Sequence, residues 1–214
     1  TDSGTSKVGD LEFVQLGPSS PSLSVSGGMS LTVAGTAEIN GYQISHDTGN
    51  LTFQSTPSFS NSSSLSVSNG ELILQNGGTF DGSSVNLSAS VFKPSGTVAV
   101  TNGGSFTLNE TSSIVLQGDT TLSQSGTANW PELDLGGKSL TLGSTVSSFT
   151  IQKALNIANG ESLSSGSSDV NLSNTLVIDN GGKLESGTGD VNLQGALTLN
   201  GEIEKGGGIL DVFK

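Results

Sequence analysis

Residues 155–172 read LNIANGESLSSGSSDVNL, and residues 176–193 read LVIDNGGKLESGTGDVNL. The two stretches align without a gap at an offset of 21 residues, so that Leu155 matches Leu176. A third copy begins at Leu197 on the same offset. A fixed period of this length is typical of solenoid proteins, in which each repeat forms one coil and buries its apolar face against its neighbours.

Apolar residues recur in pairs at positions i and i+2 along most of the chain. This spacing places both side chains of a pair on the same face of an extended strand. Gly, Asn and Ser separate the pairs, and the dipeptide Asn-Gly, which tolerates the positive φ of tight turns, occurs seven times. Because no segment shows helical periodicity, the sequence predicts an all-β chain of short strands and turns.

The repeat contains three strand positions in about 21 residues, which predicts a three-sided parallel β-solenoid with about 21 residues per coil. A meandering β-sandwich would explain short strands but not residue identity at this offset. A disordered linker would share the low hydrophobic content of 32% but not the periodicity. The predicted core columns are Leu155/Leu176/Leu197, Ile157/Ile178/Leu199 and Val170/Val191.

Three segments depart from the regular repeat. Residues 1–22 contain few apolar pairs and are predicted to form an N-terminal arm or cap, whereas residues 23–214 are predicted to form the solenoid. Within the solenoid, residues 54–64 and 119–132 are predicted to be protruding loops. Trp130 would either form an aromatic tip on the second loop or cover a corner of a coil.

The composition favours a location outside the cell. The chain has 19 acidic residues against seven lysines and no arginine, for a net charge of −12. Because a polyanion is repelled by such a surface and arginine is the preferred ligand for phosphate and guanine, no nucleic-acid partner is expected. The absence of cysteine excludes disulfides, and no apolar run is long enough to span a membrane. The start at Thr1, without methionine, is expected either of a mature form after signal removal or of an excised fragment, and the first is favoured, at an extracellular or cell-surface location.

The phrases NGGTFDGSSVNL, NGGSFTLNETSSIVLQGD and NGGKLESGTGDVNLQGALTLNG lie within residues 65–210. In these phrases the chain resembles the β-helical passenger regions of bacterial autotransporters and filamentous-haemagglutinin-like adhesins. It is also similar to the Gly/Ser/Asn-rich stacked β-arc proteins of microbial sheaths and surface fibres. The resemblance implies a β-helical fold and a structural or adhesive role.

The sequence contains no distinctive catalytic motif. His46, the only histidine, lies in SHDTGN without a Gly-x-Ser-x-Gly elbow, and is interpreted as an exposed turn residue rather than the base of a triad. Several β-helix families degrade polysaccharides, and the acidic residues supply many chance carboxylate pairs. The lyases of this fold class typically use a basic residue, commonly arginine, which this chain lacks. The protein is therefore expected not to be an enzyme.

Asp169, Asp190 and Asp211 form the best candidate site because they share the 21-residue offset. They would stack as a ladder at about 4.8 Å, the spacing of neighbouring strands. Carboxylates at that distance repel one another unless water hydrates them or calcium bridges them. The sequence lacks the Gly-Gly-x-Gly-x-Asp nonapeptide of calcium β-rolls. The prediction is solvated turn aspartates that cap backbone amides, with calcium as the possible cofactor.

These features predict a structural, self-assembling extracellular protein, such as a building block of a fibre, sheath or surface layer. Asp211, Val212 and Phe213 repeat a strand position without a polar capping segment after them, which predicts a homopolymer joined through strand edges. One alternative is an adhesin or autotransporter-like stalk that binds glycans or a cell surface. A second alternative is a polysaccharide-active β-helix enzyme.

Overall fold

The computed structural model of the protein describes residues 5–9, 11–14 and 21–213. All regular elements in these residues are β-strands, and they pair in parallel in both compact units of the chain, Thr1–Ser112 (unit 1) and Ser113–Lys214 (unit 2). None of the described residues belongs to a helix with the length and hydropathy of a membrane span. The prediction of an all-β solenoid is confirmed.

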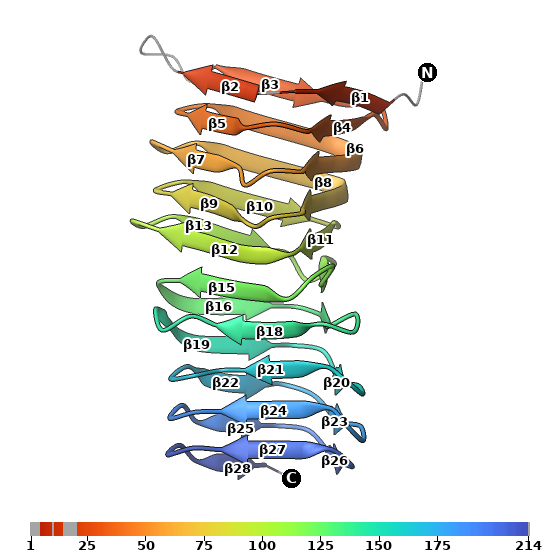
Figure 1. The fold of residues 1–214 in the computed structure, drawn as a ribbon, viewed down its shortest axis with the longest axis vertical. Helices are drawn as coiled ribbons and strands as arrows, with labels where there is room; N and C mark the ends of the chain where they lie inside the picture. The colour runs from red at the N-terminus through yellow and green to blue at the C-terminus, as the bar shows by residue number, and fades with distance from the viewer. Residues whose placement is uncertain (1–4, 10, 15–20, 214) are drawn as a thin grey trace. The chain divides into compact units, whose positions relative to one another are not determined.

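Unit 2 is a three-sided parallel β-solenoid in which each coil contributes one strand to each of three sheets, stacked in sequence order (Figure 1). The first sheet contains β15 (Thr120–Gln124), β18 (Ser139–Leu142), β21 (Ser162–Ser164), β24 (Lys183–Ser186) and β27 (Glu202–Lys205). The second contains β16 (Gly126–Trp130), β19 (Val146–Ile151), β22 (Asp169–Leu172), β25 (Val191–Leu193) and β28 (Leu210–Val212). The third contains β20 (Leu155–Ile157), β23 (Leu176–Ile178) and β26 (Leu197–Leu199), and the paired strands β14 (Ser113–Val115) and β17 (Leu133–Asp134) open the unit.

The predicted core columns of unit 2 are confirmed by the strand register. The aligned positions are Leu155/Leu176/Leu197, Ile157/Ile178/Leu199 and Val170/Val191. Most of these side chains are at most 1% exposed, whereas Leu199, in the last coil, is 48% exposed. Each coil has a thin core of its own, so the apolar side chains leave water only when coils stack.

Unit 1 has the same parallel pairing, but its strands differ more in length, because β6 and β8 have 11 residues each. One sheet contains β1 (Thr5–Val8), β3 (Ser22–Val25), β4 (Ser30–Val33), β6 (Gln43–Phe53), β8 (Ser64–Leu74), β10 (Ser84–Ser88), β11 (Val91–Pro94) and β13 (Ser105–Leu108). The other contains β2 (Leu11–Val14), β5 (Ala37–Asn40), β7 (Ser58–Ser60), β9 (Gly78–Asp81) and β12 (Gly96–Thr101).

The long strands β6 and β8 each line two sides of a coil. The first half of β6 pairs with β3 and its second half with β4, and β8 likewise pairs with both β10 and β11. Between the halves the backbone turns through left-handed φ values of 56° at Thr48 and 91° at Gly49. Gly70 of β8 occupies the same corner one coil later, opposite Gly49. A Cβ at Gly70 would lie 2.3 Å from the Gly49 carbonyl oxygen, so this position requires glycine.

The segments predicted to be protruding loops contain core strands instead. Residues 54–64 include β7, whose Phe59 is fully buried and stacks on Phe80 with ring centroids 5.1 Å apart. Residues 119–132 include β15 and β16, and Trp130 is buried against Phe149. In β7 the single aromatic Phe59 is the inward residue of the strand, whereas in β15 and β16 the inward positions include polar or small residues such as Gln124 and Ala128, so the apolar i, i+2 pair is missing or weak.

The N-terminal segment also joins the solenoid where it is described. Strands β1 and β2 pair in parallel with β4 and β5, so residues 5–8 and 11–14 form part of the first coil and are not an arm. The rest of the predicted cap, residues 1–4, 10 and 15–20, lies outside the described residues.

Candidate functional site

Asp169 and Asp190 lie at the same corner of unit 2, one coil apart. Oδ1 of Asp169 accepts a hydrogen bond of 2.9 Å from the backbone N–H of Asp190. Oδ1 of Asp190 accepts one of 2.7 Å from the backbone N–H of Ile209 in the coil after it. Each carboxylate therefore caps a backbone amide of the following coil, which is the structural role predicted for these turn residues.

Asp211 lies elsewhere, and the predicted ladder of three aspartates is wrong in its third member. Asp211 pairs with Asn192, and Leu210 lies opposite Val191, an advance of 19 residues. The advance is 19 and not 21 because the turn before β27 is two residues shorter than its counterpart. It comprises residues 200–201, whereas the equivalent turn one coil earlier comprises residues 179–182. The shorter turn moves every later residue of the last coil by two positions.

Hydrogen-bonded amides, and not a cluster of ligands, brace the outer face beside this corner. Nδ2 of Asn192 donates to Oδ1 of Asn171 at 3.0 Å, and Nδ2 of Asn171 donates to Oγ of Ser148 at 2.9 Å. In the described part of the chain, no group of three or more His, Cys, Asp or Glu residues is placed to hold a metal ion. The possible calcium site suggested by the sequence is thereby reduced to two carboxylates, each of which caps a backbone amide.

Glu161 is a buried carboxylate that the sequence did not single out. Its side chain is 7% exposed, and its two oxygens accept hydrogen bonds from the backbone N–H groups of Gly137 at 2.7 Å and Ala158 at 2.8 Å. The carboxylate thus joins two coils and closes the turn before β21. The sequence offered no signal for this role, because Asn-Gly-Glu also occurs at residues 200–202, where Glu202 is exposed.

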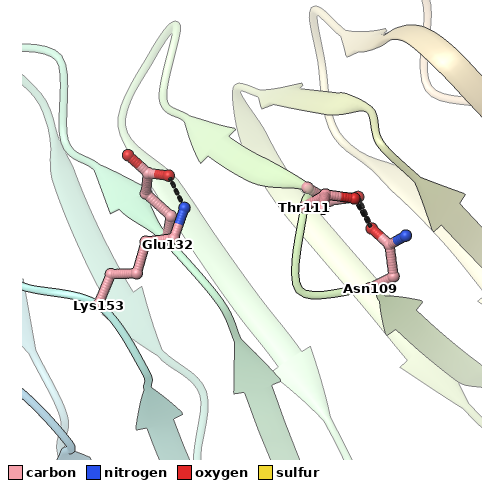
Figure 2. A network of polar contacts seen from close by, with 5 residues as sticks. Asn109, Thr111, Glu132 and Lys153 are labelled. Atoms are coloured by element: carbon pink, nitrogen blue, oxygen red, sulfur yellow. Dashed lines mark hydrogen bonds and ion pairs between the residues drawn. The ribbon is translucent and has the colours of Figure 1, made fainter.

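Three lysines form ion pairs between neighbouring coils. Lys153 donates to Glu132 at 2.6 Å, as Figure 2 shows, and Lys93 donates to Glu71 at 2.5 Å. Lys183 contacts both Glu185 and Glu204, and hydrogen bonds to these carboxylates raise the pKa of Lys183 above its ordinary value. Ion pairs at the protein surface contribute little stability individually.

Figure 2 also shows the Thr111 hydroxyl hydrogen-bonded to Oδ1 of Asn109 in a turn of unit 1.

In one polar groove of unit 2, two carboxylates lie on neighbouring strands of the same sheet. The groove is floored by the corner glycines Gly166, Gly187 and Gly206 and is flanked by Glu185 and Glu204. These two carboxylates lie opposite each other on neighbouring strands of one sheet, and both are bound by Lys183. A glycosidase needs its two carboxyl groups on either side of a sugar-sized cleft.

The interpretation of His46 as an exposed turn residue is wrong. His46 lies within β6 and is 1% exposed, two positions after the inward-facing Ile44. A buried ring cannot act as the base for a surface serine. The alternation of β6 extends through His46, and this continuation of the i, i+2 pattern was the available signal.

The exposed large hydrophobic side chains of the described residues are all in the last coil of unit 2. They are Leu199, Ile209, Val212 and Phe213, which are 40–57% exposed. Strands β26, β27 and β28 of this coil each pair with a single neighbouring strand in the described chain. We call this coil, residues 197–213, the C-terminal edge. Within residues 21–213, the C-terminal edge combines backbone groups that face no other strand with exposed apolar side chains.

No family model, curated protein or solved structure matched the chain. The C-terminal edge and the cross-coil contacts are therefore the observations from which a function can be inferred.

Proposed function

We propose that this protein is a structural extracellular building block that self-assembles into a fibre, sheath or surface layer through its strand edges. The C-terminal edge carries the proposal. An exposed strand edge is a template for pairing with another chain. Here Val212 and Phe213 are exposed on the edge strand and just after it.

The hydrogen bonds between β28 and β25 show which backbone groups of β28 point away from β25. The Phe213 N–H donates to the Leu193 carbonyl at 2.8 Å, and the Ile209 carbonyl accepts from Val191 N–H at 2.8 Å. In a parallel pair, alternate residues direct their backbone groups to the same neighbour. The N–H and C=O of Val212 therefore point away from β25. A strand from a second copy of this chain would pair with these groups and cover the apolar side chains beside them.

Other features support a non-catalytic role outside the cell. The only histidine is buried, and the carboxylates described above cap backbone amides or pair with lysines. The strongly acidic charge suits an extracellular protein. The resemblance to autotransporter-like passengers and stacked β-arc surface proteins points to the same location.

Substitution of Val212 tests the proposal. Val212→Pro removes an outward-facing N–H donor without removing a hydrogen bond to β25, whereas Val212→Ala retains the donor. We expect wild type and Val212→Ala to form oligomers in sedimentation velocity, and Val212→Pro to remain a folded monomer with an unchanged circular dichroism spectrum. Val212→Pro that assembles like wild type would contradict assembly through this edge. A strictly monomeric wild type would favour the adhesive stalk that binds glycans or a cell surface.

A further inference from the structure

His46 occupies a core column of unit 1 that is otherwise aliphatic. In the strand register, Val25 of β3 and Val67 of β8 lie on either side of it, and Leu87 follows Val67. The His46 side chain is 1% exposed, and in the described part of the chain neither Nδ1 nor Nε2 has a hydrogen-bond partner. A buried polar group without a partner is costly and rare in folded proteins.

The charged groups around His46 are few and offer little compensation for a positive ring. On its own strand the single charged residue is Asp47, whose side chain points outward and is exposed. Strands β3 and β4 carry no titratable side chain, and the only one on β8 is Glu71, which is paired with Lys93. Burial lowers the pKa of His46 below 6.5, and it outweighs the Met29 backbone carbonyl and Asp47, which favour the protonated ring.

His46 also lies directly beneath an apolar groove. The groove has a volume of about 260 Å³ and is lined mainly by apolar side chains of the first coil and of the start of the second, which are Val8, Leu11, Leu23, Val25, Met29 and Leu31. Val25, which pairs with His46, is one of these lining residues. The pairing of β3 with β6 therefore keeps Val25 in place, where it both lines the groove and covers the imidazole.

We propose that His46 is an acid-sensitive latch, whose protonation separates β3 from β6 and opens the first coil of unit 1 together with its groove. A proton taken from solvent turns the ring into an imidazolium, which has two N–H donors and needs water or an acceptor for each. Near the ring the closed column offers only the Met29 backbone carbonyl, so at least one N–H of the imidazolium would lack a partner. Separation of β3, the strand that covers the ring on the groove side, is the smallest movement that admits water.

The direction of the pH dependence follows from the lowered pKa. Above pH 6.5 the ring is neutral in both the closed and the open coil, and the closed coil keeps its full stability. Below pH 6.5 the open coil binds a proton that the closed coil does not. Each further pH unit then favours opening by about tenfold, until the pH reaches the pKa of the closed coil.

Amide hydrogen exchange of the full chain tests the latch. Between pH 7.5 and 5.0, after correction for intrinsic exchange rates, we expect the opening equilibrium constant of β3 and β6 in wild type to rise by about tenfold per pH unit below 6.5. His46→Leu should abolish this rise, because leucine cannot be protonated. Leucine also occurs in the same column, at Leu87. Strand β23 of unit 2 serves as the internal control. Equal pH dependence of β6 in wild type and His46→Leu would overturn the proposal.

A direct titration covers the case in which the variant does not fold. Because His46 is the only histidine, a protein without a histidine tag has one imidazole signal in an NMR spectrum. We expect the ring of the closed coil to remain neutral at pH 6.5 and to titrate only as the amides of β6 lose protection. A ring that titrates at pH 6.5 or above while β6 stays protected would also overturn the proposal.

Discussion

Leu176 and Val177 are neighbours in sequence but face opposite sides of β23. Leu176 is fully buried in a core column, whereas Val177 is half-buried on the outer face. Leu176→Ala should therefore lower the free energy of unfolding by about 2–5 kcal/mol, because it removes buried methyl groups and leaves a cavity. Val177→Ala should cost less than about 1 kcal/mol. Denaturant unfolding of both variants measures the difference, and equal losses would contradict the assigned faces.

Glu161 shows how a buried carboxylate stabilises a turn. Glu161→Ala leaves the N–H groups of Gly137 and Ala158 without their acceptors, which we expect to cost about 1–3 kcal/mol per unsatisfied group. Glu132→Ala is the matched control, because the exposed pair with Lys153 should contribute about 1 kcal/mol or less. Thermal or denaturant unfolding distinguishes the two variants. A larger loss for Glu132→Ala would show that Glu161 is not a structural acceptor.

Single residues also mark the limits of reading a strand pattern. Phe59 and Trp130 are buried in strands within segments that were predicted to be loops. The i, i+2 pattern detects pairs of large apolar residues, but Phe59 is the only buried residue of β7, and Trp130 is paired only with the small Ala128 on the inward face of β16. His46 was missed for a related reason, because a polar residue at an inward position is read as a turn.

Among the elements, the strands of unit 2 were the most predictable. The gapless alignment of 155–172 with 176–193 places β20–β22 over β23–β25 in the observed register. The position of Asp211 was not predictable by extension of this alignment, because the turn before β27 is two residues shorter. The bends within β6 and β8 could not be predicted from the sequence either. Asn69-Gly70 indicates a turn between two strands, but β8 pairs with β6 both before and after this dipeptide.

The corner formed by Gly166, Gly187 and Gly206 provides a test of coil stacking. A Cβ at Gly187 would lie 2.1 Å from the Gly166 carbonyl oxygen, so alanine there must push two coils apart. Gly207, in the same corner of the last coil, has only a side-chain methyl at 3.8 Å. We expect Gly187→Ala to lower the melting temperature by several degrees, consistent with a loss on the order of 1–3 kcal/mol, and Gly207→Ala to have little effect. Equal tolerance at both positions would contradict the close stacking.

The aspartate corner beside β22 and β25 allows a test of metal dependence. Asp169 and Asp190 each use one oxygen to cap a backbone amide, and the third predicted aspartate lies elsewhere. We therefore expect the melting temperature to be the same in calcium and in a chelator. A ligand that bound only the folded chain would raise it. A calcium-dependent rise, lost in Asp190→Asn, would establish the metal site that the sequence suggested.

At the scale of the whole molecule, the net charge of −12 opposes self-association. Repulsion between copies acts over a screening distance of about 10 Å at 0.1 M salt and about 3 Å at 1 M salt. The hydrogen bonds and apolar contacts proposed for the C-terminal edge act at shorter range. Assembly should therefore strengthen as salt increases.

Negative-stain electron microscopy of the purified protein across salt concentrations tests assembly through strand edges most directly. We predict extended fibres or sheets for wild type and Val212→Ala, more abundant at high salt, and separate particles for Val212→Pro under the same conditions. Separate wild-type particles at every protein and salt concentration would contradict the proposed function.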